Sequence, residues 1–368
     1  MNRRWLRWMP AAVIPAVVAT AVAVGSLPAG AADPLPGKTP DQILALIAEH
    51  NVQSLSGKVE QTSNVGLPEL PNTGPSPAAA EMSWLELLSG PHTARVYADG
   101  PTKARIQVLD RMAERDVVWN GSELWLYSSR NNSAAHLTLP DERSITGEAP
   151  GGQPEHPDYS AVRTPAQLAQ KLLTKLDPGT DVAVGPEVQV AGRAAYNLVL
   201  TPRSQQSLVG SVSIGVDGET GLPLSFSVLA RGQTEPAFSV AYTSVSLGAP
   251  ESSLFEFTPP PGATVKELQP PQRPVPSPDS GKVGPSAEGE HPTLTGSGWE
   301  TVVELPASKG SSVGAALLSE PLLQQATVAV AGGKVLTTSL VNILLTNDGR
   351  IFAGAVPVEM LQAAATPR

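Results

Sequence analysis

The chain has 368 residues, with 25 Lys and Arg against 34 Asp and Glu, a net charge of −9, and no cysteine. The acidic balance argues against nucleic acid and anionic membrane as partners, because phosphate binding requires clustered Lys and Arg. The lack of cysteine excludes disulfides, thiolate metal sites, a cysteine nucleophile and a lipid-modified cysteine at the end of a signal. The 37 Pro and 33 Gly indicate that much of the chain is turn and linker.

The first 32 residues have the layout of a secretory signal. Arg3, Arg4 and Arg7 precede an apolar run over residues 9–24, and the small residues at 29–32 suit cleavage. We expect this segment to be removed on export, so that the protein acts in the cell envelope or outside the cell. The alternative is an uncleaved membrane anchor. The two adjacent arginines partly resemble a twin-arginine signal, which leaves the export route open.

Capping and turn signals divide the next part into a helix, a strand and a long loop. Thr39-Pro40-Asp41 predicts a helix start, because Thr can cap, Pro fits the first turn and Asp suits the positive end. Apolar residues follow at helical spacing over 43–47. A strand is expected over residues 55–61. The Pro-rich loop at 64–80 is either a functional flap or disordered.

Short alternating segments then predict a run of strands. Asn120-Gly121, between two of them, is the strongest short hairpin signal. A second helix is expected over residues 166–176, because Thr164-Pro165 begins it and Asp177-Pro178-Gly179 ends it. The strands expected before and after this helix cover residues 93–99, 104–109, 116–119, 123–127, 135–139, 182–190 and 194–201.

Residues 209–260 show the clearest pattern in the chain. Three segments alternate between apolar and small polar side chains, and short Gly-containing joints at 217–221 and 231–235 separate them. Period 2 is typical of half-buried antiparallel strands, so we predict a meander with one apolar face. The apolar members are Val212, Ile214, Val216, Leu224, Phe226, Val228, Phe238, Val240 and Tyr242.

The last hundred residues change character twice. Residues 269–298 are rich in proline and poor in apolar residues, which indicates a semi-rigid linker. A small C-terminal α/β segment is expected over residues 299–368, with a hairpin turn at Asn347-Asp348-Gly349. Its expected elements are strands at 300–305, 327–330, 339–346 and 351–356 and a helix at 313–323. The predicted organisation is therefore a signal at 1–32, a main domain at 33–268, this linker and this segment.

Catalytic signatures are weak throughout the chain. None of the five His forms a spaced ligand pair. Residues 310–314 fit G-x-S-x-G, but no His follows Ser312, as the triad order on that fold requires. The chain has no phosphate loop or dinucleotide fingerprint, and Asp110, Glu114 and Asp116 read as ordinary surface. We therefore expect no enzyme activity, no cofactor and no metal.

The order helix, strands, helix, strands predicts an α+β fold in which a curled antiparallel sheet of about ten strands covers its helices. With these elements, residues 33–268 resemble the LolA/RseB-like family of exported lipoprotein carriers and sigma-factor regulators, which has actinobacterial members. Four segments carry the resemblance: the strand after the first helix, a Trp-bearing hairpin, a V-D-x-x-T-G-L-P-L turn and a closing F-x-F-x-P-P. They are residues 52–61, 118–127, 216–224 and 254–260.

The resemblance implies an unclosed half-barrel with helices on its concave face and an apolar cavity for acyl chains. Such a role needs no catalytic residue, only a dry pocket and a lid, for which residues 66–80 are the candidate. Alternatively, the inward side chains only pack the helices onto the sheet. The inward positions proposed to line the cavity are Trp84, Leu88, Val96, Ile106, Trp119, Trp125, Phe226 and Phe238.

The favoured function is an exported, non-catalytic carrier of an acyl chain or lipoprotein. The resemblance also implies an alternative, an envelope-stress regulator that binds a membrane anti-sigma factor, since a second structured segment follows the main domain. A third candidate is a structural or adhesive surface protein that uses the fold without a ligand. The C-terminal segment can instead dock on the main domain and complete the sheet edge that an open half-barrel leaves unpaired.

Overall fold

The computed structural model describes residues 34–67, 90–110, 113–139, 164–174, 176, 178–268, 292–305 and 325–366. Residues 1–37 form one compact unit, of which only 34–37 are described, without helix or strand. Residues 38–368 form the other unit, and it contains two sheets. The signal segment, most of the candidate lid and the helix expected at 313–323 lie outside the described residues.

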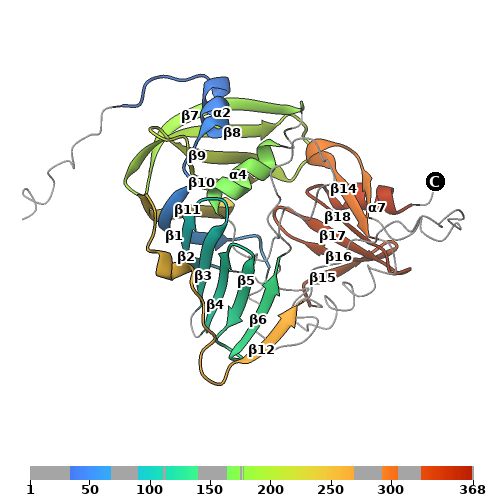
Figure 1. Cartoon of the computed structure of the whole chain (residues 1–368). Helices are drawn as coiled ribbons and strands as arrows, with labels where there is room; N and C mark the ends of the chain where they lie inside the picture. The colour runs from blue at the N-terminus through green and yellow to red at the C-terminus, as the bar shows by residue number, and fades with distance from the viewer. Residues whose placement is uncertain are drawn as a thin grey trace, which may run out of the picture. The chain divides into compact units, whose positions relative to one another are not determined.

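The larger sheet has twelve strands in the order β12-β6-β5-β4-β3-β2-β1-β11-β10-β9-β8-β7 (Figure 1). The first strand, β1 (Ser54–Ser63), lies inside the sheet, where it separates β2–β6 from β7–β11. All pairs are antiparallel except that of β12 (Thr264–Leu268) with β6 (Ser133–Thr138). The remaining strands are β2 (His92–Asp99), β3 (Lys103–Asp110), β4 (Ala113–Asn120), β5 (Glu123–Ser128), β7 (Thr180–Val190), β8 (Arg193–Pro202), β9 (Val209–Asp217), β10 (Pro223–Ala230) and β11 (Pro236–Leu247).

Two helices pack on the second half of this sheet. Helix α2 (Pro40–Glu49) contacts β7 and β8, and helix α4 (Pro165–Leu173) contacts β10 and β11. Each helix begins with a capping box. The hydroxyl oxygen of Thr39 accepts a hydrogen bond from the backbone amide of Gln42, and the Gln42 side chain accepts one from the amide of Thr39. Thr164 and Gln167 form the same pair of bonds at the start of α4. Helix α2 buries Ile43 and Ile47 of its predicted stripe and leaves Leu44 half-buried, whereas α4 buries the small Ala169 and leaves its leucines half-buried. A small residue at this point lets the backbone of α4 approach the sheet closely.

The turn between β9 and β10 lies close against α2. Asp217, at the end of β9, accepts two hydrogen bonds from the Arg193 guanidinium, at 2.8 and 2.9 Å, and one from the amide of Thr220 at 3.0 Å. Gly221 has a φ of +77°, and a Cβ there would lie 2.3 Å from the carbonyl oxygen of Leu46 in α2. The position therefore needs glycine both for its backbone conformation and for the close approach of the helix.

The C-terminal residues form a sheet of their own in the order β13-β14-β18-β17-β16-β15, with helix α7 (Val358–Ala365) packed on β17 and β18. Its core combines Val302, Val335, Leu344, Phe352 and Leu361. The short 3-10 helix η4 (Gly298–Glu300) precedes β14. The strands are β13 (Thr293–Thr295), β14 (Val302–Leu305), β15 (Thr327–Val330), β16 (Gly333–Thr337), β17 (Asn342–Thr346) and β18 (Ile351–Gly354).

Hydrogen bonds connect this C-terminal sheet to the larger one. The amide of Leu208, just before β9, donates to the carbonyl of Ala355 at 2.8 Å. The indole Nε1–H of Trp299 donates to Thr180 Oγ1, at the start of β7, at 2.8 Å. The alternative in which the C-terminal segment completes the edge of the first sheet is wrong for the described strands, because β7 and β12 form the two ends of that sheet and the described C-terminal strands pair among themselves.

The predicted fold class, an α+β half-barrel of curled antiparallel sheet, is confirmed. The hairpin at Asn120-Gly121 and the three-stranded meander lie where they were expected. Among the described strands and α-helices, four were not predicted: β12, β13, β16 and α7. Of these, β13 lies inside the range expected to be linker, and α7 lies at the end of the chain, where no helix was predicted.

Candidate functional site

One face of the twelve-stranded sheet carries most of the predicted cavity residues, and we call it the inner face. Directly paired residues of antiparallel strands point to the same side, so the strand register defines this face. Val96 pairs with Ile106, Ile106 with Val117, and Val117 with Leu126 across β2–β5. In the second half, the same rule places Phe238, Val240, Phe226, Ile214 and Leu198 together.

The inner face is continuous across β1. Val59 pairs with Ala94 on one side and with Tyr242 on the other, in spite of a register shift next to it. Gly57 fits under the ring of Tyr242, where a Cβ would lie 2.6 Å from Cε1. Tyr242 is 3% exposed, and burial raises the pKa of its hydroxyl above the ordinary value. The centre of the face is thus tightly packed, and Gln61 of β1 is a buried polar residue within it.

Burial varies along the inner face. Under α4, Leu224 and Val240 are fully buried and Phe226 is 7% exposed, so this part is packed core. Across β4–β6, Leu124 and Leu137 are buried, but Val117, Trp119 and Leu126 are only half-buried. Helices α2 and α4 make their main contacts with β7, β8, β10 and β11. The half-buried apolar side chains of β4 and β5 are therefore the part of the inner face best placed to contact a ligand.

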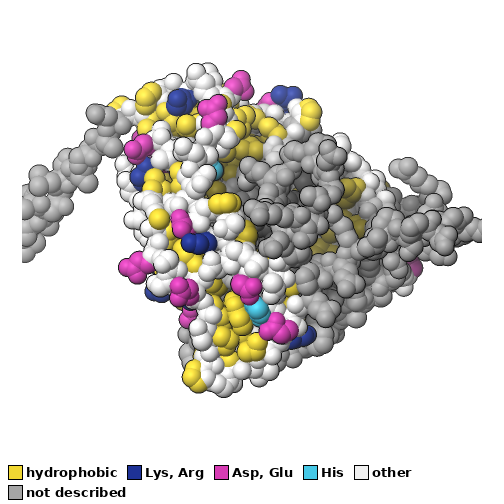
Figure 2. Space-filling model, viewed as in Figure 1, with side chains coloured by type: hydrophobic (Ala, Val, Ile, Leu, Met, Phe, Trp, Pro, Cys, Tyr) yellow, Lys and Arg dark blue, Asp and Glu magenta, His cyan; other side chains and the backbone are white. Residues whose placement is uncertain are grey.

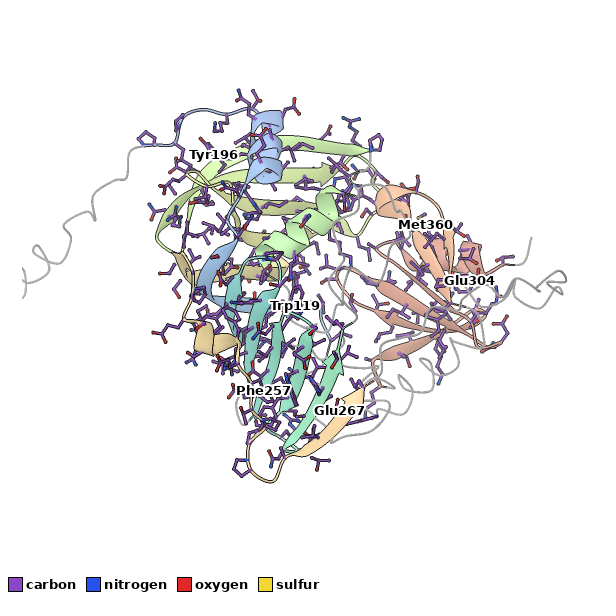
Figure 3. The ribbon with its side chains drawn as sticks, viewed as in Figure 1. Trp119, Tyr196, Phe257, Glu267, Glu304 and Met360 are labelled. Carbon is purple, nitrogen blue, oxygen red and sulfur yellow. The ribbon has the colours of Figure 1, made fainter. Side chains whose placement is uncertain are left out.

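The structure brings five of the eight predicted cavity residues onto the inner face: Val96, Ile106, Trp119, Phe226 and Phe238. Trp84 and Leu88 lie outside the described residues. Trp125 points to the opposite, outer face, because it pairs with Val118 while Trp119 pairs with Leu124. Figure 3 shows Trp119 on β4, well apart from Phe257, the outer-face partner of Trp125.

Several inner-face residues were missed at the sequence level. Val117, Leu124, Leu126 and Leu137 share this face with Trp119 through the β4–β5 and β5–β6 registers. A signal for them was present. With a two-residue turn between Asn120 and Glu123, residues on one face have opposite parity across the hairpin, so Trp119 belongs with Leu124 and Leu126 rather than with Trp125.

The outer face of β3–β6 is covered by the segment after β11. Its 3-10 helix η3 (Ser252–Phe255) contacts β3 and β4, where Arg105 Nη1 donates to the carbonyl of Leu254 at 3.0 Å. Phe255 is 1% exposed. The closing F-x-F motif therefore packs on the outer face.

Arg105 also bonds both carboxylate oxygens of Asp116 on this outer face. Asp116 is 3% exposed, so the expectation that it is ordinary surface is wrong. Burial raises the pKa of the Asp116 carboxyl, and the bonds and charge of Arg105 only partly offset this rise. The pair fixes the guanidinium that holds η3, which explains a buried charge without a catalytic role.

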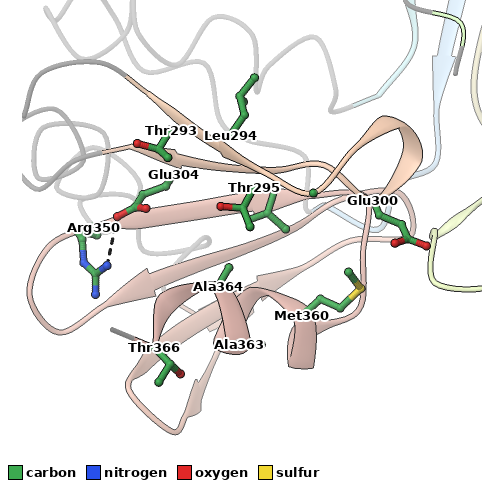
Figure 4. Close-up of a pocket in the computed structure, with 12 residues that line it drawn as sticks. Thr293, Leu294, Thr295, Glu300, Glu304, Arg350, Met360, Ala363, Ala364 and Thr366 are labelled. Carbon is green, nitrogen blue, oxygen red and sulfur yellow. Dashed lines mark hydrogen bonds and ion pairs between the residues drawn. The ribbon is translucent and has the colours of Figure 1, made fainter. Parts of the chain in front are cut away.

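A separate pocket of about 760 Å³ lies in the C-terminal sheet, between β13 and β14 on one side and α7 on the other (Figure 4). Leu294, 66% exposed, and Thr295 line it from β13, and Met360 and Ala364 line it from α7. Two of its charged side chains pair with each other, because the Arg350 guanidinium bonds the carboxylate of Glu304 at 3.2 Å. The pocket is a mixed apolar and hydroxyl surface.

Among the described residues, no group of three or more His, Asp or Glu could hold a metal ion. None of the described helices is both long and apolar enough to cross a membrane. Across the visible face in Figure 2, acidic and basic side chains are interspersed rather than gathered by sign.

Comparison with known proteins gives structural neighbours only. No protein-family model and no curated protein matches the chain. A crystal structure of MucB is similar, with 18% identity over 89% of this chain and 96% of that chain and a TM-score of 0.40. So is the MucA/MucB complex of Pseudomonas aeruginosa, with 16% identity, 88% and 96% coverage and a TM-score of 0.41.

A LolA superfamily protein from Nitrosomonas europaea is also similar in structure. It is 10% identical over 60% of this chain and 99% of its own, with a TM-score of 0.22. Identities and TM-scores of this size say nothing about ligand or partner. Those follow only from the residues of this chain.

Proposed function

We propose that the protein is an exported, non-catalytic carrier that holds an acyl chain, free or on a lipoprotein, against the inner face of its large sheet. One observation supports this most directly: Val96, Ile106, Val117 and Leu126 form an apolar row across β2–β5 on the inner face, and Val117, Trp119 and Leu126 are only half-buried there. Apolar side chains that are grouped on one face and still partly exposed offer a hydrophobic ligand a surface to contact.

The energetics suit a carrier. Hiding an acyl chain from water is worth about 0.8 kcal/mol per CH2, so a long chain contributes roughly 10 kcal/mol. Part of this gain is lost in immobilising the chain, which leaves moderate and reversible binding. The methylene groups of the acyl chain need no hydrogen-bond partners. The apolar rows of β2–β5, from Val96 to Leu126, supply the necessary contact without a catalytic group.

The mature protein, purified from its own cell envelope, is expected to carry acyl lipid at a substantial fraction of one chain per molecule. Native mass spectrometry gives the mass and stoichiometry of the bound species, and mass spectrometry of an organic extract identifies it. A matched sample, delipidated and re-exposed to palmitate, should regain one equivalent. Repeated preparations without any acyl species, together with no uptake of palmitate, would contradict the carrier and favour a structural protein.

The C-terminal pocket favours a second candidate, a regulator that binds a membrane anti-sigma factor. The pocket beside α7 is open, and its strand β13 is the end of the sheet with all three residues exposed. Unpaired strand edges next to apolar side chains suit an extended segment of a partner. This candidate uses a different surface from the acyl site, so the two can be tested separately.

In pull-downs from solubilised membranes, the full chain is expected to retain an anti-sigma factor, and Thr295→Arg is expected to lose most of it. Thr295 pairs with Val302 of the core that α7 covers, so the substitution places a charge on the pocket side of β13, and because Thr295 is exposed, folding should be unaffected. Val328→Arg is the matched control, because Val328 is 62% exposed at the opposite end of the same sheet. Equal capture by all three proteins would count against this site.

A further inference from the structure

The chain leaves the large sheet along a defined route over its outer face. After β11 it forms η3, places Phe257 against Trp125 and Tyr127, with ring centroids 5.3 and 5.7 Å apart, and then pairs as β12 with the edge strand β6. We call residues 251–268 the strap. The strap is the last described segment before residues 269–291, so its attachment decides where the chain departs from the sheet.

The outer end of the strap is held by one histidine. His136 of β6 lies in register with Glu267 of β12, and its Nδ1 is 2.9 Å from a carboxylate oxygen of Glu267. Its Nε2 bonds the carboxylate of Glu123 on β5. The ring stacks on Trp125, with centroids 4.1 Å apart and planes 19° from parallel. In Figure 2 a histidine lies between acidic side chains beside hydrophobic side chains over β5 and β6.

We propose that His136 is a pH-dependent latch that fastens β12 to the edge of the large sheet. An imidazolium has two N–H donors, and here each points to a carboxylate, one on the sheet and one on the strap. The neutral ring has one donor only. One of its nitrogens then presents a lone pair to a carboxylate, and the bridge between β5 and β12 is lost.

Among the described residues, the charged groups that pair with His136 are two carboxylates, one on β5 and one on β12. From β5 it faces Glu123 and the Trp125 ring, and from β12 it faces Glu267. Lys266 is in register with Ala135, so it belongs to the other side of the strand pair. The rest of β12 contributes little apolar burial, since residues 264–267 are exposed. The latch and the edge pairing are thus the main attachment of this strand.

Two opposing influences set the pKa of His136. Burial lowers the pKa of His136, but the hydrogen bonds and charges of Glu123 and Glu267 outweigh it, so the pKa lies above the ordinary 6.5. A group with a raised pKa stabilises the attached state fully below about pH 6.5, and this contribution is lost as the pH rises through the higher value. The strap is therefore fastened in mildly acidic surroundings and loosened in alkaline ones.

Hydrogen exchange of the amides of residues 264–268 tests the latch on the full chain. After correction for intrinsic exchange chemistry, we expect exchange to be about three- to tenfold faster at pH 8.5 than at pH 6. His136→Gln should remove this dependence, with exchange fast at both values. An NMR titration of the His136 ring should give the same midpoint as the exchange data.

Two further variants keep the test decisive. Glu267→Gln removes the strap carboxylate without touching the sheet and should also abolish the pH dependence, whereas Glu235→Gln, on the exposed β10–β11 turn, should retain it. The proposal is overturned if His136→Gln keeps the wild-type dependence, or if exchange at 264–268 stays constant while the His136 ring titrates. Amides of β3 and β4 serve as the internal reference for global unfolding in every sample.

Discussion

Asp217→Ala is expected to lower the free energy of unfolding by about 3 kcal/mol. The carboxylate is 1% exposed and accepts from Arg193, at 2.8 and 2.9 Å, and from Thr220. Removing it leaves the Arg193 guanidinium, which is 26% exposed, without its main partner. It also releases the turn that holds Gly221 against α2. Urea denaturation followed by circular dichroism measures the loss, and the dependence of the unfolding free energy on urea concentration should stay unchanged.

Asp181→Ala is the matched control for this substitution. Asp181 pairs with Arg203 at 2.7 Å, but both side chains are more than half exposed, so the expected cost is within about 0.5 kcal/mol. The pH dependence adds a second check. Burial raises the pKa of Asp217, but Arg193 and Thr220 outweigh it and hold the pKa below 3.8. Its stabilisation is present above about pH 3.8 and is lost as the pH falls through the lower value. Similar costs for the two variants would contradict this account.

Trp119→Ala is expected to weaken binding of palmitate by about tenfold, or about 1.4 kcal/mol. The indole is half-buried on the inner face, with its Nε1–H bound to the carbonyl of Gly121 at 2.7 Å, so its position is fixed before a ligand arrives. A ring that shields roughly two CH2 groups accounts for an effect of this size. Isothermal titration calorimetry of the delipidated protein measures the dissociation constant directly.

Trp125→Ala is the matched control for Trp119→Ala. It is the same residue type on the same hairpin, but it lies on the outer face against Phe257 and His136. Palmitate affinity should stay within about twofold of the wild type, while exchange at residues 264–268 should rise because the strap loses its aromatic support. If Trp125→Ala weakens palmitate binding as much as Trp119→Ala, the assignment of the acyl chain to the inner face is wrong.

Local patterns predicted the strands well because each strand carries its own evidence. The alternation from Val212 to Tyr242 and the Gly turns determine β9–β11 without reference to the rest of the chain. Helix α2 follows likewise from Thr39 and the stripe at Ile43 and Ile47. Strand β12 could not be found this way, because most of its residues are exposed, its short sequence mixes polar and apolar residues, and it exists only through pairing with β6.

The candidate site was predicted less well, for two physical reasons. Which side chains share a face depends on register across hairpins, and the error at Trp125 came from treating both tryptophans of one hairpin as equivalent. Burial of charge depends on tertiary contacts. Asp116 looks like a surface acid in the sequence, and only Arg105 together with η3, about 140 residues away in the chain, accounts for its burial.

The position of β1 in the middle of the large sheet has a consequence for the speed of folding. Leu55 pairs with Leu247, so the sheet cannot join its two halves until most of the chain is available. The β2–β6 and β7–β11 runs consist of neighbouring hairpins and can form early, each by itself. Pairings between residues so distant in sequence are slow, typically milliseconds to seconds or longer. The two halves of the sheet thus stay separate until β11 meets β1.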